Sequence, residues 1–198
     1  MPEPSRIFVA GASGVIGVRL VPLLIAGGHT VAGMTRTPAN AERLLQLGAE
    51  PILCDVYDRD ALTEAVVAFG PTIVVHQLTD LPDEADDLPS YRDRNLRIRR
   101  EGTANLLAAA RAAGCRQILA QSIAWRAPEP AGAEILAFEQ QVLDAAGVVI
   151  RYGQFHGLGT YYPEEPPPPP RIQIDAAARA TVGLLDAEPG VYELVADD

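Results

Sequence analysis

The stretch IFVAGASGVIG, residues 7–17, decides the fold of this chain. Its first four residues form a short apolar run typical of a buried strand, and the apolar residues after Gly17 begin a helix. Between the two runs, Gly11, Gly14 and Gly17 form a G-x-x-G-x-x-G turn. Glycines at this spacing permit a tight turn, and the amide N–H groups at the start of the helix stabilise phosphate charge. The motif therefore predicts the pyrophosphate cradle of a dinucleotide-binding domain.

Apolar runs and helical patterns alternate along the rest of the chain, which is typical of right-handed βαβ units in a parallel sheet. We predict strands at residues 6–10, 30–35, 50–54, 72–78, 117–122, 148–154 and 191–195. The predicted helices span residues 14–27, 39–47, 58–69, 90–113, 133–146 and 175–187. The expected fold is a Rossmann-like, doubly wound α/β sheet of about seven parallel strands, with helices on both faces.

Composition limits the classes of protein to which the chain can belong. Its 198 residues, 48% of them hydrophobic, suit a single domain over residues 1–198. A net charge of −10 opposes nucleic-acid binding, because phosphate backbones are anionic. No apolar run approaches the ~20 residues of a membrane span and the amino terminus lacks a signal-peptide core, so we expect a cytoplasmic protein without a membrane partner. The two cysteines show no metal-binding spacing, and no metal site is expected.

Three long segments follow predicted strands, at residues 79–90, 123–132 and 155–171. Ligands of open α/β sheets bind beyond the carboxyl ends of the strands, so we expect these segments to rim the pocket. The first is acidic and is interpreted as a solvated loop. The last contains a proline run that favours a stiff polyproline II segment, which can serve as a spacer, a lid hinge or a partner-docking segment.

The ordered series of motifs resembles the extended or atypical branch of the short-chain dehydrogenase/reductase superfamily, the NAD(P)-dependent epimerase/dehydratase-like proteins. The motifs that carry the resemblance lie at residues 9–17, 54–56, 101–107, 121–122, 151–153, 157–160 and 172–175. Relatives in this branch continue into a larger carboxyl-terminal substrate lobe, whereas this chain stops soon after its last predicted strand. The resemblance therefore implies a reduced lobe and a small-molecule substrate.

The end of the second predicted strand bears on the choice of dinucleotide. NAD-preferring sites place a carboxylate there, but residues 30–41 contain none, and Arg36 is suited to a 2′-phosphate. We therefore expect NADP (NADPH) rather than NAD. The resemblance implies that Asp55 meets the adenine amino group and that Val56 packs against the ring. The remaining candidate cofactor contacts lie in the glycine turn and after the fourth strand: Gly11, Ser13, Gly14, Val15, Ile16, Gln77 and Leu78.

The resemblance also implies a catalytic Ser or Thr, a Tyr and, four residues later, a Lys that lowers the tyrosine pKa. This chain contains no lysine, because all 16 basic residues are arginine. Alignment of the helix at 133–146 puts Ala131 and Ile135 at the Tyr and Lys positions, so the Tyr-x-x-x-Lys pair is missing. We take Ser122, Tyr152 and His156 as the candidate catalytic residues, since each lies near the end of a predicted strand at the expected pocket.

Three functions remain open. The first is an atypical NADP-dependent oxidoreductase or epimerase-like enzyme acting on a small metabolite, of the kind found in secondary metabolism. The alternatives are a non-catalytic protein that senses NADP(H), and a non-redox cyclase or isomerase. The helix at 90–113 carries five arginines that are expected to face solvent or the acidic loop: Arg92, Arg94, Arg97, Arg99 and Arg100. Both a monomer and a homodimer therefore remain open.

Overall fold

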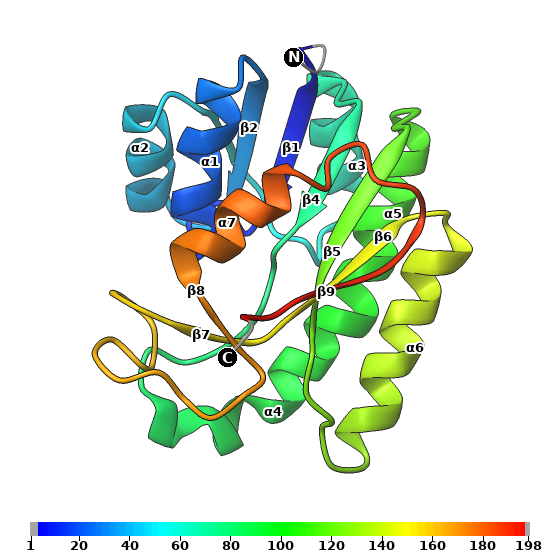
Figure 1. The fold of residues 1–198 in the computed structure, drawn as a ribbon. Coiled ribbons are helices and arrows are strands. Elements are labelled where there is room, and N and C mark those ends of the chain that lie inside the picture. The colour runs from blue at the N-terminus through cyan, green and yellow to red at the C-terminus, as the bar shows by residue number, and fades with distance from the viewer. Residues whose placement is uncertain (1–3, 197–198) are drawn as a thin grey trace.

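The computed structural model describes residues 4–196 and confirms a parallel sheet of seven strands (Figure 1). The strand order is β3-β2-β1-β4-β5-β6-β9, which reverses direction between β1 and β4. The strands are β1 (Arg6–Ala10), β2 (Thr30–Thr35), β3 (Glu50–Leu53), β4 (Ile73–His76), β5 (Gln117–Ile123), β6 (Val148–Tyr152) and β9 (Gly190–Leu194). Ligands bind at such a topological switch point, beyond the carboxyl ends of β1 and β4.

Helices cover both faces of the sheet, as predicted. On one face, α1 (Gly17–Ala26), α2 (Pro38–Gln46) and α7 (Ile174–Val182) pack against the sheet (Figure 1). The other face carries α3 (Arg59–Phe69), α5 (Thr103–Ala112) and α6 (Ala131–Asp144). Their apolar sides, together with the buried strands, form the core. Pro22 lies inside α1, which continues through it.

The long helix predicted at 90–113 is wrong in one respect, because a π-helical turn divides it. A short 3-10 helix, η1 (Ala85–Asp87), leads into α4 (Leu88–Arg97), and the turn η2 (Ile98–Gly102) precedes α5. Single π turns are frequent at functional sites. Here Ile98 and Arg99, consecutive in sequence, are only 3% and 6% exposed, so both face the interior.

The chain also leaves the sheet earlier than predicted after β6. Residues 154–156 belong to a separate two-stranded sheet, in which β7 (Gln154–His156) pairs with β8 (Arg171–Gln173). Gly153 makes this divergence possible, because a Cβ there would lie 2.6 Å from the Arg171 carbonyl carbon. The expected spacer at 155–171 is therefore bounded by paired strands rather than being an open loop throughout.

Candidate functional site

A glycine turn joins β1 to α1 at the switch point of the sheet. Gly11 has a φ of 87°, and a Cβ at this position would lie 2.6 Å from the Gln77 carbonyl oxygen. Only glycine allows β1 and the chain after β4 to approach so closely. The first turn of α1 has no side-chain cap and no acidic residue, so its amide groups can bind an anion. This local structure fits the pyrophosphate of a dinucleotide.

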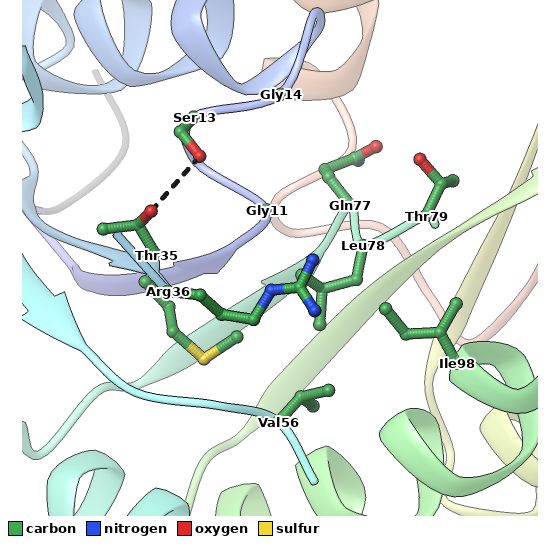
Figure 2. A pocket seen from close by; sticks show the side chains of 11 residues that line it. Gly11, Ser13, Gly14, Thr35, Arg36, Val56, Gln77, Leu78, Thr79 and Ile98 are labelled. Carbon is green, nitrogen blue, oxygen red and sulfur yellow. Dashed lines mark hydrogen bonds between the residues drawn. The ribbon is translucent and has the colours of Figure 1, made fainter. Parts of the chain in front are cut away.

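Beside the turn lies an open groove, shown in Figure 2. Seven of the predicted cofactor contacts line it: Gly11, Ser13, Gly14, Arg36, Val56, Gln77 and Leu78. Four further residues complete the lining: Met34, Thr35, Thr79 and Ile98. Of the three segments expected to rim the pocket, only 79–90 contributes to this lining, through Thr79.

Arg36 supplies the charge of the groove. It follows the last residue of β2, and its side chain extends across the groove in Figure 2. Among the described lining residues it is the only charged one, and it forms no ion pair within residues 4–196. Its neighbour Thr35 accepts hydrogen bonds at Oγ1 from the Ser13 hydroxyl (3.5 Å) and the Thr37 amide (3.4 Å). These contacts tie the end of β2 to the glycine turn and leave the guanidinium for a ligand.

Three predicted cofactor contacts do not line the groove. Val15 is exposed and Ile16 is buried, and both belong to the turn before α1. Asp55 follows β3, where its Oδ1 accepts a hydrogen bond from the Tyr57 amide at 3.0 Å. The adjacent Val56 does line the groove. An adenine contact by Asp55 therefore stays a prediction.

Ser122 is fully buried and engaged by other side chains. Its hydroxyl donates to Glu139 Oε1 at 2.5 Å, and Arg151 donates to both Glu139 oxygens, at 2.9 and 2.6 Å. These contacts join β5, β6 and α6. A catalytic Ser122 would have to exchange its Glu139 partner for a substrate oxygen.

Tyr152 and His156 differ from the expectation of accessible acids near Ser122. Tyr152 is 2% exposed on the α1/α7 face of the sheet, opposite the α6 face that Ser122 joins. Its hydroxyl lies 2.6 Å from Thr181 Oγ1, and burial raises the pKa of the phenol to about 12. His156 is half-buried on β7 and does not line the groove. The structure therefore does not bring the three candidates together.

His76, at the end of β4, is a neutral polar group in the core. Its Nδ1 accepts from the Leu78 amide at 3.2 Å, so Nε2 carries the proton and donates to Thr103 Oγ1 at 2.9 Å. Burial, and secondarily the nearby Arg99 charge, lower the pKa of His76 to about 3. His76 thus orients the chain that leads from β4 into the groove.

A Rossmann sheet with a glycine turn at its switch point defines a class of dinucleotide-binding proteins. Residues 7–141 match the NAD dependent epimerase/dehydratase family, and the chain belongs to that family. The resemblance to extended short-chain dehydrogenases is thereby confirmed.

Named relatives include reductases and dehydrogenases. A Streptomyces sp protein named 3-diazoavenalumate denitrifying reductase is 39% identical over 81% of this chain and 59% of its own length. The decarboxylating sterol-4-alpha-carboxylate 3-dehydrogenase of Dictyostelium discoideum is 31% identical over 44% of this chain and 26% of its own. This chain thus spans about three fifths, or less, of these two relatives.

The fold matches solved epimerases. The UDP-glucose 4-epimerase of Thermus thermophilus, in complex with NAD, has a TM-score of 0.75 and 22% identity. The match covers 98% of this chain and 78% of the epimerase. At this identity the likeness shows the fold alone. Two further findings concern residues 4–196: they contain no helix suited to crossing a membrane and no cluster of potential metal ligands.

Sequence reasoning missed Met34 and Ile98 as lining residues and included Thr79 only as part of the segment 79–90. Met34 adjoins a predicted contact at the end of β2, so its position in the sequence was a usable signal. Ile98 had no such signal, because it reaches the groove from the π turn of a segment that reads as one helix.

Proposed function

We propose that this chain binds NADP(H) and acts in a reductase that delivers a hydride to a small electrophilic substrate. The observation that carries the proposal is the groove itself, with a capless helix start at the glycine turn and an unpaired arginine beside it. The helix start suits the pyrophosphate, and Arg36 suits a 2′-phosphate through paired hydrogen bonds. Membership of the NAD dependent epimerase/dehydratase family supports the dinucleotide.

The side chains around the groove favour a substrate that needs no proton from the protein. The chain contains no lysine, Tyr152 is buried with a raised pKa, and His76 stays neutral between two partners. When bound, NADPH supplies a hydride, which on an arenediazonium carbon forms the C–H bond while the C–N electron pair leaves with N₂, consuming no proton. The name of the Streptomyces relative, a denitrifying reductase of a diazo compound, supports this acceptor class.

Within this proposal, the chain's own residues bind and orient. The glycine turn holds the pyrophosphate, and Arg36 holds the 2′-phosphate on the adenosine ribose. The apolar side chains of Val56 and Ile98 exclude water from the groove. Fixing the nicotinamide relative to the acceptor removes most of the entropic barrier to hydride transfer.

Calorimetry with NADP⁺, NADPH, NAD⁺ and NADH tests the cofactor. We expect the wild type to prefer NADPH over NADH by about tenfold or more, which is ~1.4 kcal/mol. Arg36→Met should remove most of that preference, because it removes the charge that pairs with the 2′-phosphate. Arg43→Met, on the exposed side of α2, is the matched control and should behave as wild type. Equal affinity of the wild type for both reduced dinucleotides would contradict the role of Arg36.

Turnover is tested with NADPH deuterated at C4 and a simple arenediazonium salt. Deuterium on the arene carbon, with release of N₂, is the expected result. Tight NADPH binding without transfer to any acceptor would favour a sensing protein. Failure of all four dinucleotides to bind would favour a non-redox cyclase or isomerase.

A further inference from the structure

Three buried side-chain atoms lack a hydrogen-bond partner within residues 4–196. They are Gln77 Oε1, Arg99 Nη1 and Gln121 Oε1. Gln77 follows the end of β4, and Gln121 lies within β5, where it pairs with Ile150 of β6. Arg99 lies on the π turn, next in sequence to the groove residue Ile98, and is the only one of the three that carries a charge. Buried polar atoms are almost always paired, so each exception calls for an explanation, and a ligand is one.

The orientation of the Gln77 amide is fixed. Its Nε2 donates to the Tyr152 hydroxyl at 3.2 Å, Tyr152 contacts Thr181 Oγ1 at 2.6 Å, and Thr181 donates to the Ala177 carbonyl. Because this chain of donors runs in one direction, Gln77 Oε1 is left as an acceptor. Gln77 also lines the groove, and it is labelled in Figure 2.

Arg99 is 6% exposed, and its guanidinium lies 5.3 Å from the centre of the Phe138 ring. Its electrostatic partner is Glu139 on α6. However, Glu139 Oε1 already accepts from Ser122 and Arg151, and Oε2 accepts from Arg151. Glu139 therefore acts on Arg99 through its charge alone, because its hydrogen bonds go to Ser122 and Arg151.

The charges around Arg99 are unevenly compensated. Arg151 pairs with Glu139 and also has Glu193 of β9 as an electrostatic neighbour, whereas Arg99 has Glu139 as its electrostatic neighbour and no ion pair within residues 4–196. His76 is neutral, because burial and Arg99 lower its pKa to about 3. A buried charge without a hydrogen-bonded partner is strongly unfavourable, so Arg99 is suited to an anion from outside the chain.

We propose that Arg99 binds a carboxylate group of the substrate. The inference rests on the proposed function, because the glycine turn and Arg36 are assigned to the phosphates of the cofactor and leave Arg99 to the substrate. A guanidinium matches a planar carboxylate through two parallel hydrogen bonds. The substrate is thus an organic acid, held by this group beyond the ends of β4 and β5.

The test uses the full chain saturated with NADP⁺ and three matched pairs of probes: acetate and acetamide, benzoate and benzamide, cinnamate and cinnamamide. Calorimetry should show at least one carboxylate binding tenfold or more tightly than its amide. Arg99→Met should abolish that preference. Arg100→Met is the control, because Arg100 is next in sequence but exposed, with ion pairs to Glu101 and Glu134, and it should keep the preference.

Two further measurements separate ligand binding from a structural role. Arg99→Met should leave the melting temperature of the unliganded protein unchanged or raise it, because it removes a buried charge whose Nη1 has no hydrogen-bond partner within residues 4–196. A lowered melting temperature, with no carboxylate preference in the wild type, would make Arg99 a structural partner of Glu139 and overturn the inference. If Arg99→Met does not fold, NMR of the wild type replaces it. The guanidinium resonances of Arg99 should then shift when the carboxylate that binds is added, and unchanged resonances would overturn the inference.

The same titrations distinguish the two proposals. A wild type that fails to bind NADP⁺ overturns the proposed function. A wild type that binds NADP⁺ but treats every carboxylate as its amide overturns the Arg99 site alone.

Discussion

At the scale of a single residue, His76 shows how the fold prevents ionisation of a buried imidazole. Protonation of Nδ1 would replace its hydrogen bond from the Leu78 amide with a repulsion between two donors, beside the Arg99 charge. The folded pKa is about 3, whereas the ordinary value is 6.5. As the pH falls below 6.5, His76 binds a proton in the unfolded chain but not in the folded chain, so the stability of the fold decreases.

We therefore predict that His76 makes the folded state lose roughly 1.4 kcal/mol per pH unit between pH 6.5 and about 3. His76→Gln keeps an acceptor for Leu78 and a donor for Thr103 but does not titrate in this range. Urea unfolding at several pH values should show a shallower acid loss for this variant than for the wild type. A His76 imidazole that titrates near pH 6.5 by NMR would contradict the prediction.

At the scale of the elements, one buried carboxylate links α6 to β5 and β6. Glu139 is the only acid that forms an ion pair with Arg151 within the described chain, and it also accepts from Ser122. Glu139→Gln keeps the shape but removes the negative charge beside Arg99 and Arg151. We expect a loss of ~2–4 kcal/mol in the free energy of unfolding, less than for a fully buried pair because Arg151 is one third exposed and keeps Glu193 as an electrostatic neighbour.

A double-mutant cycle with Arg151→Met checks this assignment in denaturant unfolding. The double variant should recover part of the loss, since it removes one of the two uncompensated charges. Additive losses would show that Glu139 and Arg151 act independently. Arg116→Met, which breaks the exposed ion pair with Asp186, is the matched control and should change stability by less than ~1 kcal/mol.

Elements whose local sequence agrees with the fold could be predicted. The strand spans at 6–10 and 30–35 match β1 and β2, because apolar runs bounded by turn residues leave little choice of boundary. The π turn and the β7–β8 pair could not be predicted in this way. The π turn is set by tertiary packing of Ile98 and Arg99, and the strand pair by the approach of Gly153 to Arg171 over a long loop.

The same division applies to the candidate site. Seven of the predicted cofactor contacts line the groove, and all seven belong to local motifs: the glycine turn, the end of β2, and the residues after β3 and β4. Arg99 was expected to face solvent or the acidic loop together with the other four arginines of its segment, and this prediction was wrong for Arg99. Its burial, and that of Tyr152, depend on which face of an element meets the sheet, and only the assembled layers determine this.

At the scale of the whole molecule, cofactor binding and stability should be linked. The groove joins the glycine turn, the ends of β2 and β4, the chain after β3 and the π turn, so unfolding destroys the binding site. A ligand that binds only the folded state stabilises it by about 2.7 kcal/mol at a hundred times its dissociation constant.

NADPH at that concentration should raise the melting temperature. NADH at the same concentration should raise it less, because it lacks the phosphate assigned to Arg36, and Arg36→Met should make the two shifts nearly equal. Differential scanning calorimetry over a tenfold series of each dinucleotide measures both effects, and a melting temperature that stays constant with NADPH would contradict binding at the groove.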